Sequence, residues 1–138
     1  CAKMRRGALN SKAKELGFNK VALGHHADDL IETMLLSLFY EGRLSTFAPK
    51  TYLDRTDITV IRPMMFLEES SVIAYSKDLP VFESCCPAND KTKREYVKNV
   101  IKTISKDVPN IREMMFTALT HPERYNLFDK FEKDAEKY

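Results

Sequence analysis

The stretch VALGHHADDLIETMLLSLFYEG, Val21–Gly42, constrains the fold of this chain more than any other part of it. Its first residues belong to a short apolar run at 20–23, which is bounded by Asn19 and Gly24 and is typical of a buried strand. A helix should then begin at Asp28 or Asp29, reach about Phe39 and stop at the final glycine. Because apolar side chains cover nearly the whole circumference of this helix, we expect it to be largely buried.

The turn between that strand and that helix carries two histidines and two aspartates, at positions 25, 26, 28 and 29. Open α/β sheets bind ligands at the carboxyl ends of parallel strands, and a helix N-terminus favours phosphate. Since carboxylates repel phosphate unless a divalent cation lies between them, a nucleotide-phosphate site with Mg²⁺ fits this turn. A structural interpretation also fits, because Asp29 and Glu32 form a capping-box pattern. A mononuclear zinc site fits less well, because adjacent residues do not easily converge on one tetrahedral ion.

The other hydrophobic patterns predict an α/β order followed by helices. We expect a helix at 5–16 with Leu9, Ala13 and Leu16 on one face, an edge strand within 46–53 interrupted by Pro49, a strand at 58–61 and a helix at 68–76. Further helices should begin near 93, 111 and 122. Thr92 to Glu95 and Asn110 to Glu113 are capping-box patterns for two of them, and the last carries Phe128, Phe131, Ala135 and Tyr138 in register.

Charge and composition favour a folded domain with two basic segments. The 138 residues carry a net charge of +2, but residues 1–20 hold six basic groups against one acidic group, and residues 87–102 hold five against two. These segments predict either a phosphate-facing surface or ordinary solvated helix faces. No apolar run or signal peptide points to a membrane or to secretion. The three cysteines therefore fit a reducing cytoplasm. A chain that begins with Cys is expected to be part of a longer protein.

Several motifs resemble one family in their order and spacing. GHHADDLIET is similar to the GHxxDDxxET signature of the PP-loop ATP pyrophosphatase superfamily, and CAKMRRGALN, VIRPM and CCPANDKTKREYVKNVI resemble flanking motifs of its tRNA 2-thiocytidine synthetase group. The resemblance covers residues 1–105 and implies an adenine-nucleotide α-hydrolase fold, a parallel sheet between helices. It also implies adenylation of a tRNA cytidine by ATP, followed by sulfur transfer. The chain would be one domain, with an α/β part at 1–82 and a cysteine segment and helical tail at 83–138.

The resemblance assigns roles to individual residues. Asp28 and Arg62 would be catalytic, Asp28 acting on Mg²⁺ or the ATP phosphates and Arg62 stabilising phosphate charge. The nucleotide would also contact Gly24, His25, Asp29 and Thr33. Cys1 and Cys86 would be two of three ligands of a [4Fe-4S] cluster, with Cys85 an incidental neighbour. The basic residues expected to contact tRNA are Arg5, Arg6, Lys93, Arg94 and Lys98.

The sequence also departs from the family pattern, because the glycine-rich SGGxDS phosphate loop and the first cysteine of the Cys-x-x-Cys motif are absent. We therefore expect a C-terminal portion that, alone, neither turns over ATP nor holds a stable cluster. An incomplete sheet would expose an edge that favours a homodimer. The expected partners are tRNA and a sulfur donor protein or sulfide. Two alternatives stay open: another tRNA-modifying PP-loop enzyme, such as a thiouridine or lysidine synthetase, or a non-catalytic domain that binds RNA or a partner.

Overall fold

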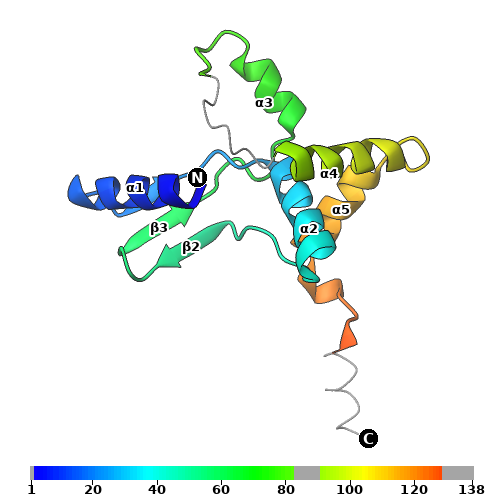
Figure 1. Ribbon diagram of the computed structural model, residues 1–138, viewed down its shortest axis with the longest axis horizontal. Helices are drawn as coiled ribbons and strands as arrows, with labels where there is room; N and C mark the ends of the chain where they lie inside the picture. Colours follow the sequence, from blue (N-terminus) through cyan, green and yellow to red (C-terminus); the bar gives the residue numbers. More distant parts are fainter. Residues whose placement is uncertain (1, 83–90, 129–138) are drawn as a thin grey trace, which may run out of the picture.

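The computed structural model describes residues 2–82 and 91–128. Figure 1 shows a small sheet at one end and a group of helices at the other. The elements, in chain order, are α1 (Ala2–Glu15), β1 (Lys20–Ala22), α2 (Ala27–Glu41), β2 (Lys50–Leu53), β3 (Ile58–Ile61), α3 (Glu69–Ser76), α4 (Lys91–Ile104), α5 (Ile111–Thr120) and the 3₁₀ helix η1 (Pro122–Arg124). None of the helices in these two ranges is long and apolar enough to cross a membrane.

The sheet has three strands in the order β1-β3-β2. β1 and β3 are parallel, with Val21 opposite Val60, as the α/β pattern predicts. β2 is antiparallel to β3, so the expectation of a parallel sheet is correct for one pair and wrong for the other. The reason is the short turn at 54–57, which returns the chain directly beside β2, whereas parallel neighbours need a long crossover.

Two separate hydrophobic cores hold the fold together. The first lies between α1 and the sheet and consists of Ala13, Val21, Ile58 and Val60. The expected apolar face of α1 contributes only Ala13, since Leu9 and Leu16 are 47% and 60% exposed. Strands of three and four residues are too short to cover the length of a 14-residue helix, and the buried residues of α1, Asn10 and Ala13, both lie in its C-terminal half.

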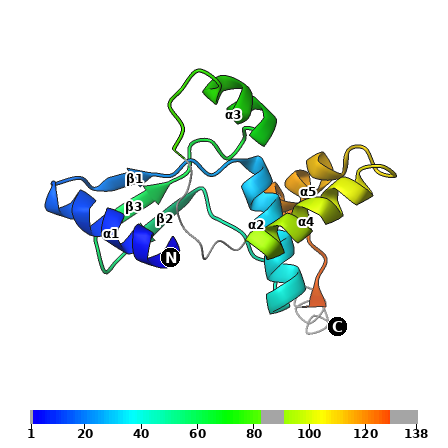
Figure 2. The same ribbon diagram turned by 45° about the horizontal axis from the view of Figure 1, so that its top comes forward.

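The second core joins α2 to α4 and α5 through Ile31, Leu35, Val97 and Ile101. Figures 1 and 2 both place these three helices together, away from the sheet. The expectation that α2 is largely buried is correct for its first two turns and wrong for its end, where Leu38 and Phe39 are 42% and 47% exposed. The helices α4 and α5 both pack on α2, but Leu38 and Phe39 are not part of the core that the three helices form.

Helix ends agree with the sequence at one boundary and differ at others. Gly42 ends α2 in the left-handed conformation (φ 62°), as expected. The capping box of α2 lies three residues earlier than predicted, because the Asp29 carboxylate accepts a hydrogen bond from the His26 N–H at 3.1 Å. Asn110 precedes α5 without a side-chain capping bond. α4 already begins at Lys91, so Thr92 lies inside that helix.

The helix expected from Pro122 is a 3₁₀ turn over Pro122–Arg124. The apolar positions predicted for its later turns, from 131 to 138, lie outside the described residues. The helix α3 has no buried residue and projects from the body in both views. Glu69, the first residue of α3, nevertheless contacts Asp28 of α2. This contact places the start of α3 at the candidate site.

Candidate functional site

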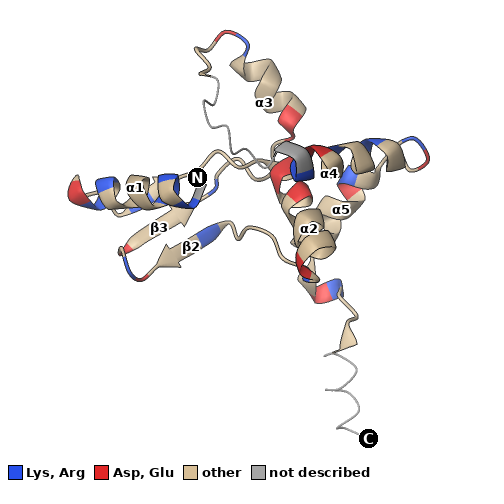
Figure 3. Cartoon of the chain, in the orientation of Figure 1, with Lys and Arg blue, Asp and Glu red and all other residues tan. Residues whose placement is uncertain are grey.

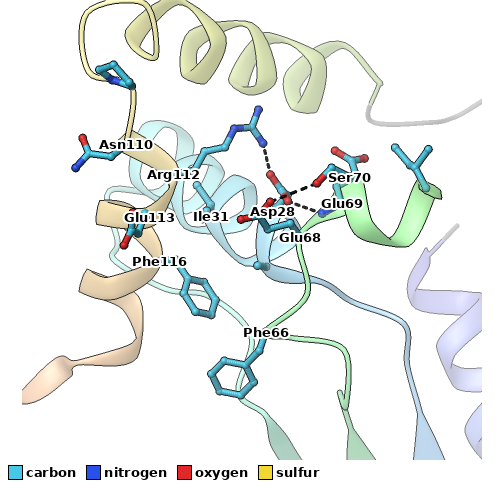
Figure 4. A pocket seen from close by; sticks show the side chains of 13 residues that line it. Asp28, Ile31, Phe66, Glu68, Glu69, Ser70, Asn110, Arg112, Glu113 and Phe116 are labelled. Atoms are coloured by element: carbon cyan, nitrogen blue, oxygen red, sulfur yellow. Dashed lines mark hydrogen bonds and ion pairs between the residues drawn. The ribbon is translucent and has the colours of Figure 1, made fainter. Parts of the chain in front are cut away.

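Two cavities flank the first turn of α2. The first, the α1 cavity, has a volume of about 630 Å³ and is lined by Arg5, Arg6, Leu9, Leu23, His25, Phe47 and Arg94. The second, the α3 cavity, has a volume of about 810 Å³ and lies between α2, α3 and α5. Figure 4 shows Asp28, Glu69 and Arg112 meeting in this second cavity. His25 and Asp28, expected to share one site, therefore line different cavities.

In the α1 cavity, His25 is held by an aromatic ring and a guanidinium group. Its imidazole stacks on Phe47 with 4.3 Å between the ring centroids. Arg62 Nε donates a hydrogen bond to His25 Nδ1 at 3.2 Å, and the Arg62 guanidinium carbon lies 5.1 Å from the centre of the Phe47 ring. Burial and then the positive charge of Arg62 lower the pKa of His25. His25 is therefore neutral at pH 7, as an acceptor of the Arg62 N–H must be.

The remaining walls of the α1 cavity are strongly basic. Arg5 and Arg6 come from α1 and Arg94 from α4, and Figure 3 shows the basic bands along α1. Within the described part of the chain, neither Arg5 nor Arg6 has an acidic partner within ion-pair distance. The α1 cavity is consequently suited to an anion such as a phosphate group.

Arg94 is arranged differently, because carboxylates of α2 already hold it. Its Nη1 atom donates to Glu32 Oε2 at 2.8 Å and lies 3.6 Å from Asp29 Oδ1. Lys98, one turn later on α4, lies 3.0 Å from a Glu69 oxygen and 3.6 Å from a Glu32 oxygen. Two of the side chains expected to contact tRNA therefore also connect α4 to α2 and α3.

Glu32 is the most deeply buried charged group of this network, at 2% exposure. Burial raises its pKa, although the hydrogen bond from Arg94 and the charge of Lys98 act in the opposite direction. Burial lowers the pKa of Lys98, but its bonds and charge interactions with Glu69 and Glu32 outweigh this and the pKa is raised. Sequence reasoning treated Glu32 only as a capping residue and missed it as a centre of charge pairing.

Asp28 has both carboxylate oxygens engaged. It is 5% exposed, and its Oδ2 accepts a hydrogen bond from the Glu69 N–H at 2.8 Å. Its Oδ1 forms an ion pair with Arg112 of α5. Sequence reasoning missed Arg112, because it is 84 residues away and lies in a segment read only as a packing helix.

Both carboxylates of this turn are bonded to protein groups. Asp28 is bonded to the Glu69 N–H and to Arg112. Asp29 accepts a hydrogen bond from the His26 N–H and lies 3.6 Å from Arg94. Across residues 2–82 and 91–128, no group of three or more His, Cys, Asp or Glu side chains is arranged to hold a metal ion. The zinc interpretation of the turn lacks support for the same reason.

Other expected site residues occupy varied positions. A Cβ on Gly24 would stand 3.9 Å from Met64 Sδ, so this glycine has room for a small side chain. The Thr33 hydroxyl is buried and has no hydrogen-bond partner among the residues that the structure describes. The Lys93 ammonium lies 4.7 Å from the centre of the Tyr40 ring. Cys1, Cys85 and Cys86 lie outside the described residues, so the cluster ligands stay predictions.

Comparison with known proteins supports a common origin for most of the chain. The proteins named tRNA-cytidine(32) 2-sulfurtransferase from Syntrophotalea carbinolica and Aliivibrio fischeri (strain ES114) are 41% and 39% identical to it. The alignments cover 97% and 94% of this chain, but 53% and 45% of the respective relatives. The chain thus spans about half the length of the curated relatives it matches.

A solved structure and a family model agree with these relatives. The U34-tRNA thiolase NcsA from Methanococcus maripaludis, solved with its [4Fe-4S] cluster, superposes with a TM-score of 0.69 at 21% identity, over 94% of this chain and 45% of that one. This similarity shows a shared fold. The family model described as a PP-loop domain matches residues 2–106, which is most of the chain. The chain therefore belongs to the PP-loop domain family.

Proposed function

We propose that this protein takes part in the ATP-dependent thiolation of a cytidine in tRNA. The observation that carries the proposal is the identity of 36–41% to several tRNA-cytidine(32) 2-sulfurtransferases over 94–97% of the chain. The basic α1 cavity supports it, because both reactants of such an enzyme, ATP and tRNA, are polyanions.

The reaction has two steps that balance without a redox change. In the first, the C2 oxygen of cytidine attacks the α-phosphorus of ATP, an O–P bond forms, and pyrophosphate leaves. In the second, a sulfur nucleophile from sulfide or a donor protein attacks C2, and AMP leaves with the oxygen. Both leaving groups are phosphates whose developing negative charge needs nearby cations.

The residues of the α1 cavity are suited to stabilise that charge. We assign phosphate binding to Arg5 and Arg6, whose guanidinium groups have no acidic partner among the described residues. Arg62 acts through His25, because its guanidinium is already bonded to the imidazole and to the Ala48 carbonyl, the latter at 2.7 Å. Arg62 is thus a positioning residue that keeps the neutral imidazole in place at the cavity wall.

The cofactors, the domain division and the homodimer expected from the sequence are proposals for this chain. ATP follows from membership of the PP-loop family. A [4Fe-4S] cluster is present in the NcsA structure, and for this chain it is proposed on Cys1 and Cys86, outside the described residues. Mg²⁺ is not assigned to the DD turn, because Asp28 and Asp29 are already bonded to protein groups. The single-domain division at residue 82 and the homodimer also stay predictions.

The test is product analysis with a purified protein that contains this chain and spans the full length of the curated relatives, together with ATP, sulfide and unmodified tRNA under anaerobic conditions. The 138 residues alone are expected to form neither product. Nuclease digestion followed by mass spectrometry should detect 2-thiocytidine, and AMP should form in equal amount. Arg5→Gln with Arg6→Gln should reduce the rate about 100-fold or more, since two phosphate contacts are removed. Lys3→Gln is the matched control, because Lys3 lies on the same helix but does not line the cavity.

Each alternative function predicts a different result in the same assay. Thiouridine or lysidine in the digest would replace the proposal with another PP-loop modification of tRNA. Salt-sensitive tRNA binding without AMP formation would favour a non-catalytic RNA-binding role. Equal rates for the double variant and Lys3→Gln would remove the α1 cavity from the mechanism.

A further inference from the structure

Asp28 joins three helices at one point. It is the second residue of α2, its Oδ2 accepts a hydrogen bond from the backbone N–H of Glu69, the first residue of α3, and its Oδ1 pairs with Arg112 of α5. Figure 4 shows both bonds converging on this one carboxylate. The side chain is 7% exposed. A carboxylate with this geometry has its oxygens directed at protein groups from two other elements.

The helix α3 depends on such polar bonds for its position. It has no buried residue, so little apolar packing holds it to the rest of the molecule. The Glu69 side chain supplies a second link, with one oxygen 3.0 Å from Lys98 Nζ, and Lys98 lies 3.6 Å from the buried Glu32 of α2. Asp28, Glu69, Lys98 and Glu32 therefore close a polar ring through α2, α3 and α4.

The same contacts leave Asp28 poorly suited to a cation. Binding Mg²⁺ would require the carboxylate to release the Glu69 N–H, Arg112 or both. A metal ion at this carboxylate would also sit beside the Arg112 guanidinium, whose positive charge would repel it.

We propose that Asp28 is a positioning residue that fixes α3 and α5 to the start of α2, and that it does not bind magnesium. Arg112 and Glu69 are its two partners in this role. The walls of the α3 cavity are then set by Asp28, because α2, α3 and α5 all line that cavity. This role does not depend on which substrate the enzyme uses.

Two substitutions at position 28 separate the bonds. Asp28→Asn keeps an oxygen that accepts the Glu69 N–H but loses the charge that pairs with Arg112. Asp28→Ala loses both bonds. Arg112→Gln tests the ion pair from its other end. Glu113→Gln is the matched control, because Glu113 lines the same cavity but forms no ion pair with a described residue.

The first measurement is amide hydrogen exchange of the folded protein. Asp28→Ala should speed exchange of the Glu69 amide about tenfold or more, whereas Asp28→Asn should leave it within about threefold of the parent. Asp28→Asn and Arg112→Gln should both speed exchange in α5. Combining Asp28→Asn with Arg112→Gln should speed exchange in α5 little more than either single substitution, because each already removes the same ion pair. Unchanged exchange at Glu69 in Asp28→Ala overturns the proposal.

The second measurement is binding of Mn²⁺ alone, followed by electron paramagnetic resonance, without ATP or tRNA. The apparent Kd should agree within about twofold among the parent, the three variants and Glu113→Gln, because Asp28 supplies no ligand. A loss of Mn²⁺ affinity of about tenfold or more in both Asp28 variants but not in Glu113→Gln overturns the proposal. Such a result would leave the proposed thiolation untouched, because neither reactant is present in the experiment.

Discussion

Replacing Glu32 by Ala tests whether the buried carboxylate stabilises the contact between α2 and α4. Glu32 accepts a hydrogen bond from Arg94 at 2.8 Å and lies 3.6 Å from Lys98, and its side chain is 3% exposed. A hydrogen bond to a charged group contributes about 1.5 to 3 kcal/mol to stability, and each buried methylene about 0.8 kcal/mol. Losing one such bond and one methylene should lower the free energy of unfolding by about 2 to 4 kcal/mol.

Two features keep the loss from being larger. Arg94 and Lys98 are 36% and 44% exposed, so water can solvate both cations once the carboxylate is gone. Burial raises the pKa of Glu32, which shows that ionising it inside the fold has a cost. Glu32→Gln keeps the volume and an acceptor for Arg94 and avoids that cost, so it should lose only about 1 kcal/mol.

The assay is urea unfolding followed by circular dichroism, with Glu95→Ala as the control because Glu95 is an exposed carboxylate of α4. With a slope of about 1 to 3 kcal/mol per molar urea, Glu32→Ala should move the midpoint down by about 1 to 3 M. A change below about 0.5 kcal/mol, the size expected of an ordinary surface substitution, would refute the reasoning. Equal losses in the Ala and Gln variants would show that charge, and neither packing nor the acceptor, controls the contact.

The raised pKa of Glu32 adds a pH signature to the same experiment. The folded state retains the Glu32 proton to a higher pH than the unfolded state, whose pKa is about 4.5. This contribution to stability is complete below pH 4.5 and is lost as the pH rises through the folded pKa. The parent should therefore lose stability relative to Glu32→Gln across that window, in paired urea titrations.

Four further changes probe other parts of the structure. The lowered pKa of His25 makes the unfolded state bind more protons, so the parent should lose stability as the pH falls through 6.5 while His25→Gln should not, in pH-dependent thermal melts. Gly42→Ala should lower the free energy of unfolding by about 1 kcal/mol because φ is 62°. Ile101→Ala should lower it by about 2 to 5 kcal/mol because the side chain is 2% exposed. Asn110→Ala should change it by less than about 0.5 kcal/mol because no side-chain capping bond is lost.

Local patterns predicted the local structure well. The apolar run at 20–23, the helix that follows and its stop at Gly42 all depend on neighbours within a few residues, and the structure confirms them. The strand at 58–61 and the short helix at 68–76 are confirmed for the same reason. The exposed end of α2 was missed, because periodicity shows that a face is apolar but not whether another element covers it.

Long-range pairing explains most of what the sequence did not reveal. Asp28 and Arg112 are 84 residues apart, and Glu32 and Arg94 are 62 apart. Nothing in the local pattern distinguishes an arginine that binds phosphate from one that meets a buried carboxylate. His25 and Asp28 line different cavities for the same reason. α3 and α5, which come much later in the chain, form walls of the cavity that contains Asp28 but not of the cavity that contains His25.

The placement of α2 explains why the basic residues divide into two groups. Because α2 packs on α4 and α5, its carboxylates face the basic side of α4 and engage Arg94 and Lys98. α1 packs on the sheet instead, and Arg5 and Arg6 form no ion pair with any of the described residues, so their charge is available at the cavity beside His25. A charge of +2 for the whole chain conceals this division. In the proposed complex with tRNA, affinity should therefore depend more steeply on the cations of α1 than on Arg94 and Lys98, which must break ion pairs before they can bind phosphate.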